Sequence, residues 1–500
     1  MPPMRRHDPL LAAVILALAT ASAPAASLKI KVRTPIVAPG RVGAIYAAID
    51  RIAGADLWPG YDLGAIPIMI DDGTQTWLAR HPSPPEGFAP VAGARGVLSA
   101  PGRRPEMVAN TSIDLAGVGT ATLMDDGTRA PEDLACLAAH EGFHVFQRAR
   151  HADWMANEAD LFGYPADDAA ALAGRRLEWE ALRRATSVGD DDAAACRARI
   201  AVDERRRRFA ALGAPAAAYE RGTELNEGLA TYVEERARAV LSPAGDRGRS
   251  LPPEEFPPDG VRQRGYLSGL ALGRLLDRMA PGWRATLEAG PTRPLDEILA
   301  AALTARVPAP PAATAPKAGA AGASPQAGLP AAPAPTPAPP CSFSAAEIDA
   351  ASARALRDVA ALEERLAALE REVLGRPGWR IVVEAAAAPL RPRSFDPLNV
   401  RNLGGGSVLH TRYLDLAVDG GTIEVLGRDA LTVAAGPHPL FGGLRRVTVT
   451  GLAARPVVTQ SDDGVTLTAE KVTMRFGSAR IVVEGETIVV TLGTPAGAAS

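Results

Sequence analysis

Two histidines four residues apart, in the run His140-Glu141-Gly142-Phe143-His144, carry the clearest chemical meaning in this sequence. Side chains four positions apart share one face of an α-helix, so both imidazoles can reach one ion at the roughly 2.0–2.1 Å of a zinc–nitrogen bond. Glu141 is rotated about 100° from His140, which keeps it off the ion but near a bound water. Chance would produce this run on the order of 0.005 times in such a chain. The run therefore predicts zinc-assisted hydrolysis, with ordinary helix histidines as the alternative.

The element that must position these histidines is predicted to be a helix from Pro131 to about Arg150. Proline suits a first helical position because its missing N–H would have no partner there. Cys136 lies one turn before His140 on the same face, and we interpret it as a buried thiol, with a metal ligand as the alternative. His151 is about two turns beyond the second histidine, which is too far for the same ion.

A third ligand must come from elsewhere, because a zinc ion that activates water usually has three protein ligands and one open position. No histidine lies between His151 and His410, which favours a carboxylate. The run from Glu224 to Tyr232, on a second predicted helix, offers Glu224 and Glu227 on one face. From the residues alone both remain candidates, and an acidic, solvated helix surface is the plain alternative.

Together the two runs resemble the gluzincin metallopeptidases, the thermolysin-like and aminopeptidase-like group, over roughly residues 60–300. Their third ligand lies in an Asn-Glu-Gly-x-Ala type stretch, which here is Asn226 to Ala230. The resemblance implies the zinc ligands His140, His144 and Glu227, with Glu141 as catalytic base. The chain departs from the group at Thr231, where thermolysin-like members carry an aspartate that orients a ligand histidine.

The resemblance also implies a hydrogen-bond donor for the oxyanion, which a downstream tyrosine or histidine supplies in related enzymes. Tyr219, Tyr232 and Tyr266 are the candidates. We choose Tyr266 because Tyr266-Leu267-Ser268-Gly269 resembles the Tyr-x-x-Gly segment of aminopeptidase-type members; a tyrosine packed in the core is the alternative. The expected mechanism is attack by a zinc-activated water, with Glu141 as general base. A strand near Gly119 to Met124 is a further candidate, as the strand to which an extended substrate adds.

Composition bounds the rest of the chain. With 47% apolar and 22% charged residues, its 500 residues suit two or three globular domains, and the net charge of -3 gives no reason to expect nucleic acid as a partner. We predict an α+β fold. Its parts are a signal peptide (1–26), the β-rich (27–130) and helical zinc-binding (131–305) parts of a zincin-like catalytic domain, an Ala/Pro-rich linker (306–343), an amphipathic helix (344–376) and an all-β sandwich or barrel (377–495).

The chain begins with the features of an exported protein. Arg5 and Arg6 precede an apolar run from Leu10 to Ala19, and small residues follow, which is typical of a secretory signal peptide. No later apolar run is long enough to span a membrane. We therefore expect a periplasmic or extracellular protein without a membrane span after cleavage. Its three cysteines allow at most one disulfide, and a pair between Cys136 and Cys196 is left open.

The region after the linker shows no catalytic constellation. A seam of apolar residues from Leu356 to Val373 predicts a short coiled coil or a docked helix. His410 and His438 lack ligand neighbours and are interpreted as structural. This helix and the β domain are candidates for contact with a protein partner.

We expect a secreted zinc metallopeptidase acting on a peptide or protein substrate. Two alternatives stay open. One is a non-catalytic exported envelope or binding protein that retains a zincin-like fold, and the other is a zinc hydrolase for a non-peptide bond.

Overall fold

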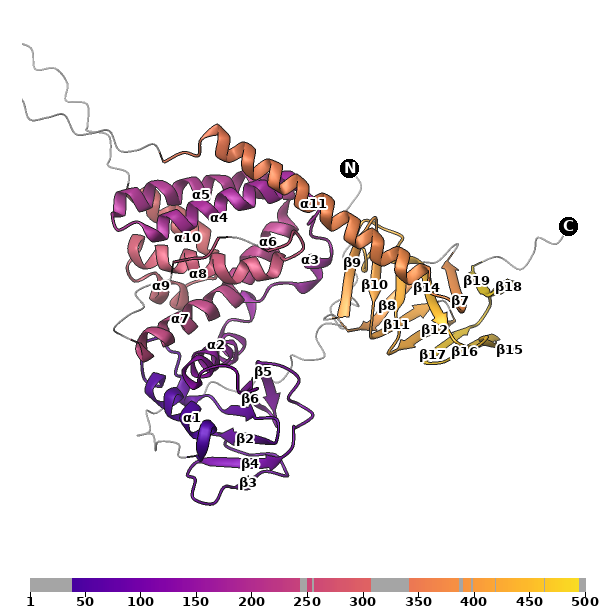
Figure 1. Ribbon diagram of the computed structural model, residues 1–500, viewed down its shortest axis with the longest axis horizontal. Coiled ribbons are helices and arrows are strands. Elements are labelled where there is room, and N and C mark those ends of the chain that lie inside the picture. The colour runs from indigo at the N-terminus through magenta and orange to yellow at the C-terminus, as the bar shows by residue number, and fades with distance from the viewer. Residues whose placement is uncertain are drawn as a thin grey trace, which may run out of the picture. The chain divides into compact units, whose positions relative to one another are not determined.

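The computed structural model describes residues 38–242, 250–253, 256–306, 341–385, 390–396, 399–418, 420–462 and 464–493. The predicted signal peptide and most of the predicted linker lie outside these residues. The chain is α+β and divides into two compact units (Figure 1). The larger unit contains described residues 38–158 and 168–356, and the smaller unit contains 159–167 and 357–493. In the described part of the chain, no helix is both long and apolar enough to cross a membrane.

A six-stranded sheet opens the larger unit, in the order β3-β4-β2-β1-β6-β5. Its strands are β1 (Ile68–Asp71), β2 (Gln75–Ala79), β3 (Ala89–Pro90), β4 (Val97–Pro101), β5 (Thr111–Leu115) and β6 (Val118–Met124). β6 pairs in parallel with β1 on one side and antiparallel with β5 on the other. Because both of its sides already carry ladder hydrogen bonds, the expectation that a substrate adds to Gly119–Met124 is wrong. β5 lies at that edge of the sheet.

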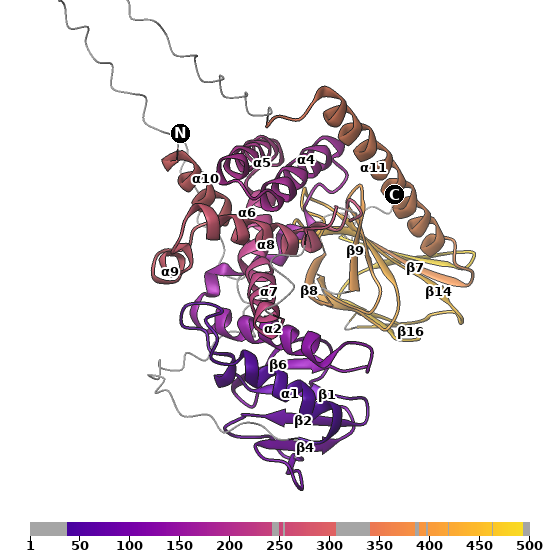
Figure 2. The same ribbon diagram turned by 60° about the vertical axis from the view of Figure 1, so that its left-hand side comes forward.

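Helices form the rest of the larger unit, as the run of strong helix formers after Pro131 predicts. They are α1 (Gly40–Ile52), η3 (Leu63–Ala65), α2 (Pro131–Arg150), η4 (Ala152–Trp154), α4 (Ala169–Ser187), α5 (Asp191–Leu212), α6 (Ala214–Thr223), η5 (Glu224–Gly228), α7 (Leu229–Leu241), α8 (Val261–Met279), α9 (Trp283–Ala289) and α10 (Leu295–Ala305). Between η4 and α4 the chain forms α3 (Glu158–Phe162), most of which belongs to the smaller unit. α4 and α5 lie side by side (Figure 2), and aspartate side chains cap the N-terminus of each.

An aromatic cluster joins the helices that matter for the site. The buried Trp58 ring meets Phe143 of α2 edge to face at 5.5 Å and Trp283 of α9 at 5.4 Å. Tyr232 of α7 packs against the same indole at 6.4 Å. Aromatic pairs at these separations add stability beyond the area that they bury. The cluster therefore fixes α2 and α7 relative to each other.

The one disulfide among the described residues joins Cys196 of α5 to Cys341. Cys196 is therefore not bonded to Cys136, the pairing that the sequence left open. Cys136 is a buried free thiol within the α2 core, as interpreted from the sequence. Arg199 of α5 also donates to the Leu303 carbonyl at 2.9 Å. Both ends of the Ala/Pro-rich segment are thus attached to α5.

Two sheets share one apolar core in the smaller unit, which makes it a β-sandwich. One sheet has the order β18-β19-β7-β14-β13-β10-β9 and the other β15-β16-β17-β12-β11-β8. The strands are β7 (Trp379–Ala385), β8 (Arg391–Phe395), β9 (Val400–Gly404), β10 (Ser407–His410), β11 (Tyr413–Val418), β12 (Gly421–Leu426), β13 (Ala430–Ala434), β14 (Leu444–Leu452), β15 (Val457–Ser461), β16 (Gly464–Ala469), β17 (Val472–Phe476), β18 (Arg480–Glu484) and β19 (Thr487–Leu492).

Two further segments pack on this sandwich. The later part of α11 (Ala345–Leu374) lays Val373 and neighbouring leucines on Leu403, Leu409 and Leu431, so part of the predicted apolar seam is a docked helix. Phe162, from the short segment 159–167, packs on Val408. That segment lies within the range predicted to be helical and zinc-binding, yet it groups with the smaller unit.

Candidate metal centre

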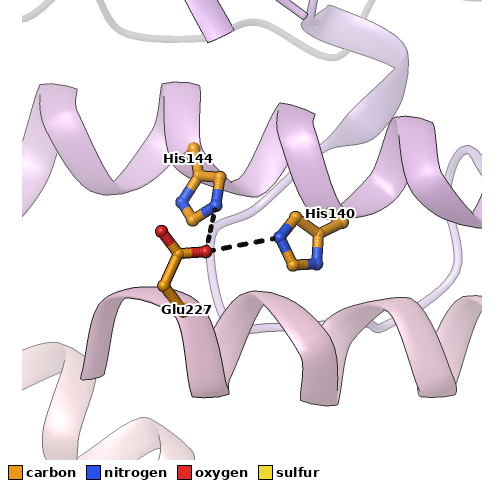
Figure 3. Close-up of side chains that lie close together, drawn as sticks. All are labelled: His140, His144 and Glu227. Carbon is orange, nitrogen blue, oxygen red and sulfur yellow. Dashed lines mark ion pairs between the residues drawn. The ribbon is translucent and has the colours of Figure 1, made fainter. Parts of the chain in front are cut away.

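Three side chains converge between two helical segments to form a group that could hold a metal ion (Figure 3). His140 and His144 come from α2, and Glu227 comes from η5, a π-helical turn between α6 and α7. One donor atom from each residue lies within 4.8 Å of the other two. Glu227 Oε2 is 3.2 Å from His144 Nε2 and 3.7 Å from His140 Nε2. No other such group occurs among the described residues.

The π turn reaches the histidines because two helices cross at glycine. A Cβ on Gly228 would lie 2.6 Å from the Gly269 Cα, and a Cβ on Gly269 would lie 2.5 Å from the Gly228 Cα. Any larger residue at either position would push η5 and α8 apart. π-helical turns are rare and are found frequently at functional sites. The glycines of the Asn226–Ala230 and Tyr266–Gly269 runs therefore have a packing reason.

Gln147, which the sequence reasoning missed, connects the two ligand-bearing segments. Its Nε2 donates to the carbonyls of Leu225 and Asn226 in the π turn, at 2.8 and 3.0 Å. Its Oε1 lies 2.8 Å from His144 Nδ1, and the opposite ring nitrogen of this histidine faces Glu227. A partner on the second ring nitrogen fixes the tautomer and the ring plane of a metal-binding histidine. The spacing of three residues from His144 to Gln147 could have revealed it.

Glu234 places a carboxylate near the other ring nitrogen of His140. Its Oε2 lies 3.4 Å from His140 Nδ1, within ion-pair distance but without good hydrogen-bond geometry, so the link is mainly one of charge. Thr231 instead donates its hydroxyl to the Glu227 carbonyl at 2.8 Å. Glu234 of α7 follows Glu227 of η5 by seven residues, or about two helical turns. That spacing was the available signal in the sequence.

Carboxylates and imidazoles at the centre shift each other's pKa values. Burial alone would lower the pKa of His140, but the carboxylates of Glu227 and Glu234 raise it to about 10. Burial alone would raise the pKa of Glu227, but the two imidazoles and Arg262 hold that pKa well below its usual range. Without a metal, His140 therefore holds a proton in the place where an ion would lie.

Glu141 lies beside this group without belonging to it. Its side chain is buried, and burial raises its pKa, while the adjacent histidines act in the opposite direction. A carboxylate with a raised pKa next to a metal position accepts a proton more readily than an ordinary carboxylate, which suits a general base. The sequence placed Glu141 off the metal, and the donor group of the structure consists of His140, His144 and Glu227 without it.

Of the three tyrosines considered, Tyr266 contacts the metal-binding group. Its ring is stacked on His140, with 6.1 Å between centroids and 11° between planes. Burial and the charge of Glu227 raise the pKa of its hydroxyl, which keeps it protonated as a donor. Tyr219 donates to Glu158 at 3.3 Å and Tyr232 donates to Asp277 at 2.8 Å.

The rival carboxylate Glu224 is engaged elsewhere. Arg205 donates from Nη1 to its Oε2 at 2.7 Å and from Nη2 to its Oε1 at 2.5 Å. The Ser268 hydroxyl also donates to Oε1. Its carboxylate thus belongs to a buried arginine network that also contains Glu178. Glu227, the glutamate that the family resemblance implied, is the one that faces the histidines.

Histidines outside the group have other partners. His151 Nε2 lies 2.9 Å from Glu288, and its ring stacks on Trp154. In the smaller unit, His410 Nε2 is 3.1 Å from the Thr432 hydroxyl, and His438 accepts hydrogen bonds from the backbone N–H groups of Leu440 and Phe441.

Comparisons with protein-family models, with curated proteins and with solved structures find no match to this chain.

Proposed function

We propose that the chain is a zinc-dependent hydrolase of the gluzincin kind, acting on peptide bonds. The observation that carries the proposal is the convergence of Glu227 Oε2 on the Nε2 atoms of His140 and His144. Two imidazole nitrogens and one carboxylate oxygen form a donor set that catalytic zinc sites use, and three protein donors leave a position for water or substrate.

Zinc supports this chemistry by lowering the pKa of a bound water and by polarising a carbonyl group. The chain's own residues would then do the rest. Glu141 takes the proton from the attacking water and passes it to the leaving amine. Tyr266 donates its hydroxyl hydrogen to the oxygen of the carbonyl as negative charge develops there. Gln147 and Glu234 hold the two imidazole rings in orientation.

Export is part of the proposal. A disulfide such as Cys196–Cys341 persists in an oxidising compartment, which supports the reading of residues 1–26 as a signal peptide and a location in the periplasm or outside the cell. Mass spectrometry of the protein purified from the exporting cell tests this directly. A mature N-terminus near residue 27 is expected, and an intact Met1 would contradict it.

The Glu141→Gln variant tests the enzyme itself. We expect zinc content equal to that of the wild type, with hydrolysis of a mixed peptide library about 10²–10⁴-fold slower, because the proton acceptor is lost while the ligands stay. Glu132→Gln, in the first turn of the same helix and exposed, is the matched control and should keep full activity.

Two results would overturn this assignment in different ways. Zinc binding without peptide hydrolysis by the wild-type protein would favour a binding protein or a hydrolase for another bond. Absence of zinc from the wild-type protein, after purification without chelators and addition of the metal, would remove the metal centre itself.

A further inference from the structure

We propose that Arg262 is a positioning residue of the metal centre, which holds one oxygen of Glu227 so that only the other faces the histidines. The inference rests on the proposed zinc site and concerns a residue that neither the sequence pattern nor the family resemblance singles out. Arg262 lies on α8, one turn before Tyr266.

The two oxygens of Glu227 have separate partners. Arg262 Nη2 donates to Oε1 at 2.7 Å, and the Asn226 side-chain amide donates to the same oxygen at 3.2 Å. Oε2 is the oxygen that approaches the Nε2 atoms of His144 and His140. A carboxylate with one oxygen held by two donors cannot turn both oxygens toward an ion without losing these hydrogen bonds. Glu227 is therefore prepared to bind a metal through a single oxygen.

Arg262 is itself held in place from the other side. Its Nη1 donates to Glu158 Oε1 at 3.0 Å, so the guanidinium lies between the carboxylates of Glu158 and Glu227. The planar fork of arginine suits such a bridge, because its donors point in fixed directions. Arg262 also interacts with the Tyr266 hydroxyl, which in turn interacts with Glu227. One side chain thus links the third ligand with the proposed oxyanion donor.

One consequence follows for an ion held at this centre. The carboxylate is oriented before the metal arrives, so less conformational entropy is lost on binding than with a free carboxylate. Loss of Arg262 should therefore weaken metal binding and change the coordination geometry together.

The test compares Arg262→Gln and Arg262→Lys in the full chain. Zinc affinity is measured by competition with a chromogenic chelator, and coordination by the visible absorption of the Co²⁺-substituted protein. For Arg262→Gln we expect zinc affinity about 10–100-fold weaker and an altered cobalt spectrum, since outer partners of metal ligands typically carry this much affinity. Arg262→Lys keeps the charge and should recover part of the affinity.

Arg274→Gln is the matched control. Arg274 is on the same helix and pairs with Glu235 of α7, so its loss also removes an ion pair between α8 and α7 but leaves the metal group untouched. It should bind zinc like the wild type. Glu158→Gln provides a second approach in case Arg262→Gln fails to fold: it loosens the anchor of Arg262, and zinc affinity should fall by less than about tenfold.

The outcomes separate this inference from the proposed function. Wild-type zinc affinity and an unchanged cobalt spectrum in Arg262→Gln would overturn the role of Arg262 while leaving the zinc site intact. An equal loss of affinity in Arg274→Gln would overturn it too, because a general effect on helix packing would then explain both. A wild-type chain that binds no zinc overturns the proposed function and this inference together.

Discussion

Two buried histidines, one in each unit, have opposite surroundings. His140 in the larger unit faces the carboxylates of Glu227 and Glu234, which raise its pKa to about 10 against the effect of burial. His410 in the smaller unit is 1% exposed, has the Thr432 hydroxyl beside it, and burial lowers its pKa to about 4. The same side chain is thus a cation under one set of neighbours and neutral under the other.

The difference teaches what makes a buried polar residue a metal site. Burial by itself disfavours charge and leaves a neutral imidazole in a packed core, as at His410. A cation is attracted only where carboxylates are buried with the imidazole and are not fully matched by arginines. Glu224, three residues before Glu227, is matched by Arg205 and contributes nothing to such a site.

The largest expected effect comes from removing the carboxylate of Glu227, the proposed third metal ligand beside His140. In Glu227→Gln, zinc affinity should fall about 100-fold or more, because the roughly 10–16 kcal/mol of a four-ligand zinc site amounts to about 3 kcal/mol per ligand. Isothermal titration with zinc measures it. Glu235→Gln, on the following helix α7 and paired with Arg274, serves as control. Unchanged affinity in Glu227→Gln would contradict the ligand assignment.

Lowering the pH should destabilise the metal-free protein through the lowered pKa of His410. The pKa of His410 in the folded protein is about 4, below the ordinary 6.5. Between these pH values the imidazole is protonated in the unfolded chain but neutral in the folded chain. Stability should therefore fall as the pH drops from about 6.5 to about 4, by up to about 3 kcal/mol from this group. Urea unfolding at several pH values, compared with His410→Leu, isolates the effect. Equal pH dependence in the two proteins would show that His410 titrates normally.

Glu234→Gln should have the smallest of the three effects. Losing the charge beside His140 Nδ1 is expected to weaken zinc binding by about 10–100-fold, with the three ligands still present. The double variant Glu234→Gln with Thr231→Asp asks whether an aspartate at the position used by thermolysin-like proteins can replace Glu234. Partial recovery of zinc affinity is expected. If Glu234→Gln alone binds zinc as tightly as the wild type, the carboxylate has no orienting role.

The parts of the fold that depend on local pattern could be predicted from the sequence. Helix α2 begins at Pro131 and ends at Arg150 as predicted, because capping and residue propensity act within a few residues. The α+β class and an all-β region after the Ala/Pro-rich segment were within reach for the same reason, whereas the choices between sandwich and barrel, and between coiled coil and docked helix, were left open.

Pairings between distant segments could not be predicted in this way. Whether Cys196 meets Cys136 or Cys341, and whether β6 is an edge strand, depends on how elements pack rather than on their own sequences. Gln147 and the π turn are 78 residues apart, yet they share hydrogen bonds that hold the third ligand in place.

The sequence by itself determined that His140 and His144 lie on one face of a helix, since four residues make about one turn whatever surrounds them. The residues alone left Glu224 and Glu227 as candidates and the family resemblance implied Glu227, but only the tertiary structure shows which carboxylate lies beside the histidines. Glu224 and Glu227 lie close together on one helical segment, and the choice between them depends on where Arg205 and the Gly228–Gly269 crossing place that segment. Such contacts come from packing across the whole unit, which short sequence motifs do not encode.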